Sequence, residues 1–348
     1  EVDVELPEHV TLVRLPGLYM DEKFTTLMAE DTAQSVASVQ RRRKDILLSQ
    51  LEQHRPDIFM IELYPFGRSV FGFELEPLLE WIRQGRFGDI KVVCSLRDIL
   101  VEKRKQEFYE ERVINSLHSY FHLLLVHSDE QLLTLDETFS RMGDIRIPTV
   151  YTGFVGPKAD PAAGRKLRQE LGIGPDDKLI VVSAGGGRSG YALLDCVLDT
   201  YPILSQKNPT RIEMFAGPFR EPEEFKRLAA KAVNGIRVRY YTKRFLDYLS
   251  AADLSVSLAG YNTCMNIMAA GVPALIFPYA KQQEQPLRVA KLNTFIPMKA
   301  LRDKDIEPAA LSRYIQDMLL EPRTARQVPI NMDGAENTAQ YLVTWLDR

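Results

Sequence analysis

Short apolar runs alternate with amphipathic stretches along most of this chain, and that alternation is the feature that most limits its fold. Such a rhythm is typical of βαβ units, in which crossover helices join parallel strands. We therefore predict an α/β protein. The predicted strands cover residues 58–63, 91–96, 122–127, 179–183, 211–216, 236–241, 254–258, 274–277 and 295–298. The predicted helices cover residues 33–54, 73–84, 101–119, 130–139, 190–205, 222–232, 245–251, 263–270, 284–291 and 305–319.

The length of 348 residues predicts two domains, since single cores rarely grow beyond about 250–300 residues. A Gly- and Pro-containing stretch at 152–157 is the best linker, and a new strand pattern begins after it. We expect an N-terminal domain at 1–153, a C-terminal domain at 154–330, and a terminal helix at 331–348 that packs across the domains.

Composition excludes several classes of protein. Lys and Arg total 44 against 47 for Asp and Glu, a net charge of −3 that argues against a nucleic-acid-coating protein. No apolar run reaches the roughly 20 residues of a membrane span, and the acidic first residues do not resemble a secretory signal. The three cysteines form no C-x-x-C pair, so we expect reduced, buried thiols in a cytoplasmic protein.

A Gly-rich turn follows the predicted strand at 179–183. Glycine allows positive φ angles and close approach of a ligand, and the start of the next helix favours a phosphate group. The turn lacks the Lys-Ser/Thr pair of the phosphate-binding loop of nucleoside triphosphatases. It also lacks the G-x-G-x-x-G spacing of a dinucleotide-binding site. A bare tight turn is therefore the alternative. Its residues are Gly185, Gly186, Gly187, Arg188 and Ser189.

A second and more specific motif follows the predicted strand at 254–258. It reads as a Gly turn, a short helix, a Gly stop and another buried strand that ends in Pro278. Asn262 or Thr263 can cap the helix and share its first N–H groups with an anion. Further on, Glu284 and Gln285 open another helix, where carboxylate and amide groups suit the hydroxyls of a sugar.

Together these motifs resemble the donor half of MurG-type glycosyltransferases. The resemblance rests on the Gly-rich turn, on G-Y-N-T with A-A-G-V-P-A-L-I-F-P at 260–278, and on E-Q at 284–285. It is closer still to a bacterial group of predicted MurG-like transferases, through I-E-L-Y-P-F-G-R at 61–68 and S-L-R-D-I-L at 95–100. It spans nearly the whole chain and implies a glycosyltransferase-B fold, two Rossmann-like domains that face each other across a cleft.

The resemblance also implies roles for residues of the C-terminal domain. The Gly-rich turn, Gly260 and Tyr261 would lie at the donor diphosphate with Asn262 and Thr263, while Glu284 and Gln285 would hold the donor sugar. Phe245 and Leu246 would lie against the nucleotide base. Asn266 stands where the family usually has a Glu that binds both ribose hydroxyls, so the charge-assisted contact is lost.

The acceptor-side candidates lie in the first domain, and Glu62, Arg97, Asp98 and His127 are at the ends of predicted strands, where α/β crevices lie. Asp98, Glu62 and His127 are candidate catalytic bases, and Arg97 and Arg68 are acceptor-side candidates. A structural role is the alternative for His127, and Glu62 is alternatively a buried acid paired with Arg68 or Arg97. The family's usual base is a His on a Gly-rich loop after the first strand, which this sequence does not contain; by this comparison the chain begins after that strand, loop and helix.

We expect no metal and no cofactor other than the nucleotide-sugar substrate. Asp303-Lys304-Asp305 is formally D-x-D, but Asp305 is better placed to cap the helix that follows. No Cys/His cluster has zinc spacing.

The predicted activity is inverting, metal-independent transfer from a nucleotide sugar to a hydroxyl acceptor. UDP is the expected nucleotide, although these motifs do not separate uracil from thymine or guanine, and peripheral contact with a membrane is a further expectation. The alternatives are a non-catalytic nucleotide-sugar or glycan-binding protein and a nucleotide-sugar 2-epimerase.

Overall fold

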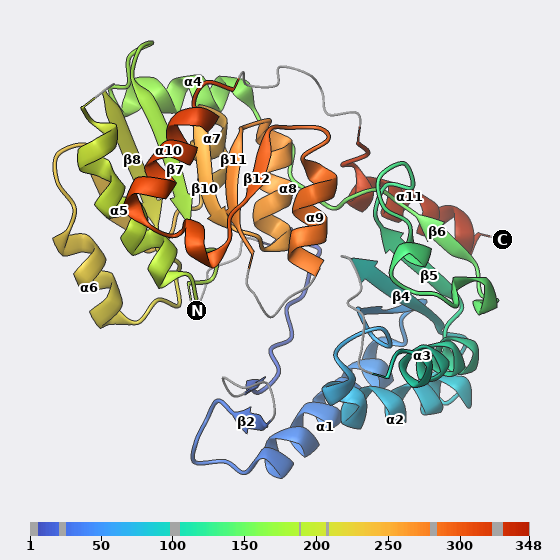
Figure 1. Ribbon diagram of the computed structural model, residues 1–348. Coiled ribbons are helices and arrows are strands. Elements are labelled where there is room, and N and C mark those ends of the chain that lie inside the picture. Colours follow the sequence, from blue (N-terminus) through green and yellow to red (C-terminus); the bar gives the residue numbers. More distant parts are fainter. Residues whose placement is uncertain are drawn as a thin grey trace. The chain divides into compact units, whose positions relative to one another are not determined.

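The computed structural model describes residues 6–20, 26–97, 105–187, 189–206, 209–278, 284–321 and 330–347, with only the backbone of Glu284 (Figure 1). The chain divides into two compact units. The first comprises residues 1–127 and 135–151, and the second comprises residues 128–134 and 152–348.

The first unit is built on a four-stranded parallel sheet in the order β3-β4-β5-β6. Its register pairs Glu62 with Ser95 and Arg97 with His127, so the carboxyl ends of β3, β4 and β5 lie side by side. Leu78 of α2 and Leu117 of α3 pack into its core. The strands are β3 (Ile58–Glu62), β4 (Lys91–Arg97), β5 (Leu123–His127) and β6 (Thr149–Tyr151), and the helices are α1 (Val36–His54), α2 (Gly72–Arg83) and α3 (Gln106–Tyr120).

Two parts of this unit were absent from the sequence prediction. A small antiparallel pair, β1 (Leu18–Met20) with β2 (Leu27–Ala29), precedes α1. The short strand β6 extends the sheet beside β5. Neither has more than three residues, too few to show a periodicity.

The second unit contains a six-stranded parallel sheet in the order β12-β11-β10-β7-β8-β9. The first strand in sequence, β7, therefore lies at the centre beside the fourth, β10, which is the doubly wound Rossmann order. The strands are β7 (Lys178–Ser183), β8 (Thr210–Phe215), β9 (Ile236–Arg239), β10 (Leu254–Leu258), β11 (Ala274–Phe277) and β12 (Met298–Ala300).

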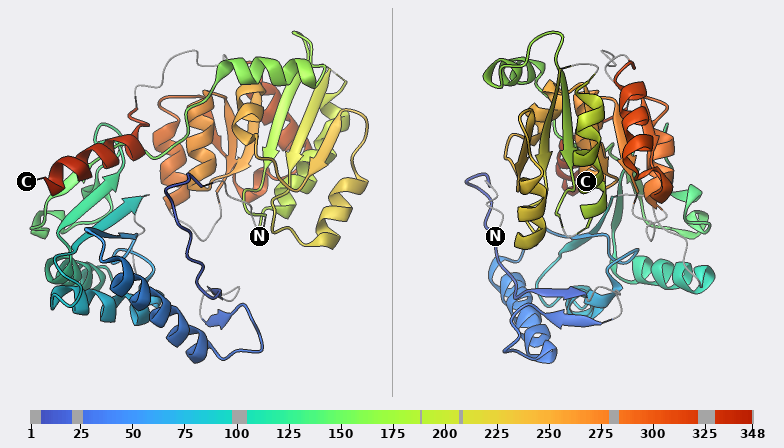
Figure 2. Two further views of the ribbon diagram at one scale, coloured as in Figure 1. Left: turned by 180° about the vertical axis from the view of Figure 1, so that it is seen from behind. Right: turned by 60° about the vertical axis from the view of Figure 1, so that its left-hand side comes forward.

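Helices cover both faces of this sheet (Figures 1 and 2). Helices α5 and α10 pack against each other on one face, and α7 packs against α4 and α8 on the other. The helices are α4 (Pro161–Glu170), α5 (Tyr191–Leu204), α6 (Pro222–Ala230), α7 (Phe245–Ala251), α8 (Tyr261–Ala270), α9 (Glu284–Leu292), α10 (Pro308–Met318) and α11 (Gly334–Leu346). Cys94, Cys196 and Cys264 are free and buried, as predicted.

Three local predictions were wrong. Residues 130–139 form turns and a single 3-10 turn instead of a helix. Asp129 just before them accepts the N–H groups of Gln131 and of Asn331, which is distant in sequence. The last strand begins at Met298, since the chain is still turning at Phe295, whose N–H donates to the Leu292 carbonyl. Asp305 ends a 3-10 turn, and Glu307 caps α10 instead.

The α/β prediction with two Rossmann-like domains is confirmed by these parallel sheets. Among the described helices, none has the length and apolar character needed to cross a membrane.

Candidate functional site

The switch in strand order between β7 and β10 defines the candidate site in the second unit. In doubly wound sheets, ligands bind at the carboxyl ends of the strands where the chain order reverses. Ser257 of β10 pairs with Ser183 of β7, so the turns that follow these strands lie side by side. These are the Gly-rich turn after β7 and the glycine turn at Gly260 after β10. The structure therefore brings together two motifs that are far apart in the sequence.

The turn after β7 requires glycine at two positions. Gly185 and Gly187 have φ angles of 58° and 91°. A β-carbon on Gly187 would lie 2.7 Å from the Ala216 carbonyl oxygen, in the turn after β8. The N–H of Phe219 also donates to the Gly186 carbonyl at 3.0 Å, which joins the two turns. Gly186 itself has space for a side chain, because the nearest atom would lie 3.7 Å away.

The hydroxyl of Thr263 lies between the two glycine turns. A β-carbon on either Gly185 or Gly260 would stand 4.0 Å from the Thr263 hydroxyl oxygen. Gly190, at the end of the first turn, approaches Leu258 at the end of β10, where a β-carbon would meet the leucine side chain at 2.8 Å. A side chain at any of these glycines would take space beside that hydroxyl or between the strands.

The helices that follow these turns, α5 and α8, begin without a side-chain cap and without an acidic residue in the first turn. Helices α4 and α10, by contrast, are capped by the carboxylates of Asp160 and Glu307. The first intrahelical bonds run from Leu194 to Gly190 and from Cys264 to Gly260. The N–H groups before them point out of the helix ends, where the helix dipoles favour negative charge. Two such helix starts side by side suit a diphosphate.

The polar face of α8 continues away from these turns. Asn262 is exposed, Thr263 is buried, and Asn266 is partly exposed one turn further on. Side chains three and four positions apart share a helix face, so Asn266 lies on the same face as Asn262 and Thr263. Tyr261, the first residue of the helix, is buried.

The predicted base-contacting residues begin α7, which packs against α8. Phe245 and Leu246 are both partly exposed. The ring of Phe245 meets that of Phe215, at the end of β8, edge to face at 5.8 Å. Tyr248, one turn further on, contacts the same Phe215 ring at 4.9 Å.

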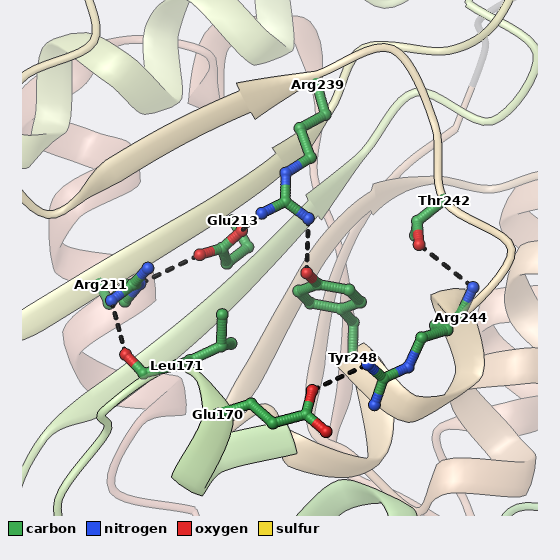
Figure 3. Close-up of polar contacts among 8 residues, drawn as sticks. All are labelled: Glu170, Leu171, Arg211, Glu213, Arg239, Thr242, Arg244 and Tyr248. Atoms are coloured by element: carbon green, nitrogen blue, oxygen red, sulfur yellow. Dashed lines mark hydrogen bonds and ion pairs between the residues drawn. The ribbon is translucent and has the colours of Figure 1, made fainter.

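Polar contacts hold α7 in place from the side of β8 and β9 (Figure 3). Arg239 donates to the Tyr248 hydroxyl at 2.6 Å and lies 3.7 Å from the carboxylate of Glu213, which is fully buried on β8. Arg211 bonds the other oxygen of that carboxylate at 3.0 Å.

A second set of contacts fixes the start of the same helix (Figure 3). Arg244 pairs with Glu170 of α4 at 2.8 Å and with Asp247 at 2.9 Å. The backbone N–H of Arg244 donates to the Thr242 hydroxyl at 3.1 Å. Phe245 and Leu246 therefore stand on a helix held on two sides.

The predicted sugar-contacting residues are at the start of α9. Gln285 is buried, and one turn later Arg288 donates to the Ala259 carbonyl at 2.6 Å, next to Gly260. Since residues three apart share a helix face, Gln285 lies on the face of α9 that meets the second glycine turn. The side chain of Glu284 and all of Arg188 lie outside the described residues.

In the first unit, Glu62 at the carboxyl end of β3 forms ion pairs with two other acceptor-side candidates. Its carboxylate pairs with Arg68 at 2.9 Å and also with Arg97. Its side chain is 40% exposed, so the alternative of a buried acid does not hold, although both of the partners named for it are present. Arg68 itself has a φ of 55°, in the left-handed region. Asp98 lies outside the described residues.

His127 ends β5 beside this ion-paired group and is 6% exposed. Its Nε2 lies 2.8 Å from the Ser95 hydroxyl oxygen on β4. Burial lowers the pKa of His127 below its ordinary value of 6.5; Glu62 opposes this shift and Arg97 adds to it. The imidazole is therefore neutral at neutral pH, the form in which a ring nitrogen can accept a proton.

Asp305 of the D-x-D sequence is hydrogen-bonded within its own turn. The carboxylate of Asp305 accepts the N–H of Arg302 at 2.9 Å and also contacts the Arg302 side chain. Within the ranges that the structure describes, no group of three or more His, Cys, Asp or Glu side chains is arranged to hold a metal ion.

Sequence reasoning missed Ser95, Arg220 and Arg288. Ser95 is the first residue of the quoted S-L-R-D-I-L motif, but only the pairing of β4 with β5 places it against His127. The two arginines are almost fully buried and bond turn carbonyls, a role that no local pattern marks.

Comparison with known proteins shows what the chain is similar to. Residues 180–341 match the glycosyltransferase family 28 C-terminal domain. A curated relative from Desulfitobacterium hafniense (strain Y51) is named UDP-N-acetylglucosamine--N-acetylmuramyl-(pentapeptide) pyrophosphoryl-undecaprenol N-acetylglucosamine transferase. It is 24% identical over 204 residues, which cover 57% of this chain and 55% of the relative. The match thus spans about half the length of that relative.

Solved structures share the fold. The calicheamicin glycosyltransferase CalG4 superposes with a TM-score of 0.58 at 16% identity, covering 95% of this chain and 85% of that one. MurG of Acinetobacter baumannii superposes with a TM-score of 0.56 at 14% identity, covering 89% and 81%. The predicted resemblance is thereby confirmed: the chain is similar to MurG-type transferases in sequence, it shares the glycosyltransferase-B fold, and most of its second unit matches the family 28 C-terminal domain.

Proposed function

We propose that the protein is an inverting, metal-independent glycosyltransferase that moves a sugar from a nucleoside-diphosphate sugar, with UDP as the expected nucleotide, to a hydroxyl acceptor. The observation that carries this proposal is the meeting of two glycine turns and two uncapped helix starts around the Thr263 hydroxyl. Backbone N–H groups there offer a diphosphate the electrostatic stabilisation that a leaving group needs, without a cation.

In this proposal residues 154–330 bind the donor. The Gly-rich turn with Arg188 and Ser189, the Gly260 turn with Tyr261, Asn262 and Thr263, and the face of Asn266 hold the diphosphate and ribose. Phe245 and Leu246 contact the base, and Glu284 and Gln285 contact the sugar. The curated relative's printed name includes UDP-N-acetylglucosamine and pyrophosphoryl-undecaprenol, which supports a UDP donor and a lipid-linked acceptor. Peripheral contact with the cytoplasmic face of a membrane is part of the same proposal.

The first unit supplies the acceptor side in this proposal, with His127 as the base. Glu62 is less suited, because two guanidinium groups share its carboxylate. His127 is neutral, and in the tautomer protonated at Nδ1 its Nε2 accepts a hydrogen bond from the Ser95 hydroxyl. An acceptor hydroxyl that transfers its proton through Ser95 to His127 becomes the nucleophile at the anomeric carbon.

Incubation of the purified full chain with labelled nucleotide sugars and a cell extract tests this function. Transfer of label to an extract component, with inverted anomeric configuration and with activity that persists in EDTA, is the expected result. Binding without turnover would instead establish a binding protein, and release of the 2-epimer would establish an epimerase. Absence of nucleotide-sugar binding would overturn all three.

Replacing Gln285 by alanine should weaken the affinity for UDP-N-acetylglucosamine by about ten- to a hundredfold, because a buried hydrogen-bonding group is lost. The affinity for UDP should stay within about twofold, since the residue contacts only the sugar. Glu284→Ala should act in the same way. Isothermal titration with both ligands measures the difference, and Gln169→Ala, exposed on α4, is the matched control. Equal losses for both ligands would contradict the assignment.

Replacing Asn266 by glutamate should raise UDP affinity, because a carboxylate accepts stronger hydrogen bonds from ribose hydroxyls than an amide does. Asn266→Gln is the control, since it has the length of glutamate without its charge. A gain of about three- to tenfold over the Gln variant is expected. No gain in UDP affinity would mean that Asn266 does not face the ribose. An equal gain in the affinity for free uracil, which has no ribose, would mean the same.

A further inference from the structure

Two buried arginines, Arg220 and Arg288, each bond one of the two glycine turns. They are 4% and 5% exposed. Arg220 donates through Nη2 to the Ser189 carbonyl at 2.6 Å, in the turn after β7. Arg288 donates through Nη1 to the Ala259 carbonyl at 2.6 Å, in the turn after β10.

The guanidinium of Arg220 is held by three segments. Besides Ser189, it contacts the Ala216 carbonyl at the end of β8 at 3.4 Å and the Glu224 carboxylate of α6 at 2.7 Å. A planar guanidinium presents its donors in a rigid fork, so these partners determine where the Ser189 carbonyl points. The Ala216 carbonyl is also the atom that limits the space at Gly187.

Arg288 is held differently. It projects from α9, one turn after Gln285, and its guanidinium lies 5.8 Å from the ring centre of Tyr261. A cation over an aromatic face is attracted to it, and this contact places the guanidinium beside the first residue of α8.

Each bond determines the direction of the next N–H group. In a planar trans peptide, the C=O of one residue and the N–H of the next point in opposite directions. With the Ser189 carbonyl directed at Arg220, the N–H of Gly190 points away from that arginine. The N–H of Gly260 likewise points away from Arg288. These glycines are the N-cap residues of α5 and α8.

We propose that Arg220 and Arg288 are positioning residues of the donor site, which hold the two turn carbonyls so that the N–H groups of Gly190 and Gly260 are directed at the donor diphosphate. This proposal rests on the proposed function, since it specifies how the same site binds its phosphates. Neither arginine needs to touch the ligand.

The test compares a nucleoside diphosphate with its nucleoside, so that the phosphate contribution is measured separately. Titration calorimetry of the full chain with UDP and uridine is made for wild type, Arg220→Gln, Arg288→Gln and Arg220→Lys, with melting temperatures recorded. Each Gln variant should weaken UDP binding at least about tenfold and leave uridine binding within about twofold. Arg227→Gln, exposed on α6, is the control and should bind both as wild type does.

The lysine variant separates position from charge. Lysine keeps the positive charge but lacks the fork, so Arg220→Lys should restore less than half of the lost binding free energy. Full restoration would overturn the proposal, as would equal losses for UDP and uridine, which would indicate general support of the fold. If the wild-type chain bound uridine and UDP equally tightly, the proposed role of the two arginines in phosphate binding would be overturned. The site would then bind only the nucleoside part of the donor. A chain that binds neither UDP, TDP nor GDP would overturn the proposed function itself.

Discussion

Replacement of His127 by asparagine should lower kcat for sugar transfer by about 10²–10⁴-fold, the usual contribution of a general base. Donor affinity should remain unchanged, because His127 belongs to the first unit and the donor residues belong to the second. Ser95→Ala should have a smaller effect in the same direction if the hydroxyl relays the proton. His54→Asn, exposed in the last turn of α1, is the control.

The pH profile gives a second measure of the same residue. A base acts in its deprotonated form, and burial lowers the pKa of His127 below 6.5. Activity should therefore persist as the pH falls to 6.5 and be lost only below it. An acid limb centred above pH 7 would contradict the assignment.

Glu62→Gln separates the two candidate bases. Because the Glu62 charge raises the pKa of His127, its removal should move the acid limb to still lower pH while kcat at neutral pH changes little. If Glu62 were the base, the same variant would lose nearly all of its kcat. A profile for His127→Asn that matches that of wild type would leave His127 with a structural role.

Replacement of Gly187 by alanine should disrupt the diphosphate site. At a φ of 91° an alanine is strained by about 1–3 kcal/mol, and its β-carbon would lie 2.7 Å from the Ala216 carbonyl oxygen. The turn after β7 must then shift away from the turn after β8. We expect a lower melting temperature and a loss of UDP affinity of at least about tenfold.

Gly186→Ala provides a matched control within the same turn. Its φ is not positive, and its β-carbon would meet only an edge atom of Phe219, at 3.7 Å. Stability should stay near wild type, and any loss of UDP affinity should be smaller than for Gly187→Ala. Equal behaviour of the two variants would show that the close approach of the turns at Gly187 does not shape the site.

The two glycine turns of the second unit were predictable from sequence because their signals are local. A glycine turn placed between a strand and a helix predicts a tight turn with exposed N–H groups wherever it occurs. The G-Y-N-T motif at Gly260 has the same form, and the structure has a helix beginning at Tyr261 directly after β10. The predicted helix at 130–139 was wrong, and the segment lies beside residues distant in sequence, since Asp129 bonds Asn331.

By itself, the sequence determined the alternation of strands and helices, the two glycine turns and the family resemblance, since each depends on residues close together in the chain. Only the tertiary structure decided which of these meet. Strand order places the turns at Gly187 and Gly260 side by side, and register brings Ser95 to His127. The buried guanidinium groups of Arg220 and Arg288 reach turn carbonyls about 30 residues away in the chain. Such contacts depend on the packing of the whole domain, and no local pattern encodes them.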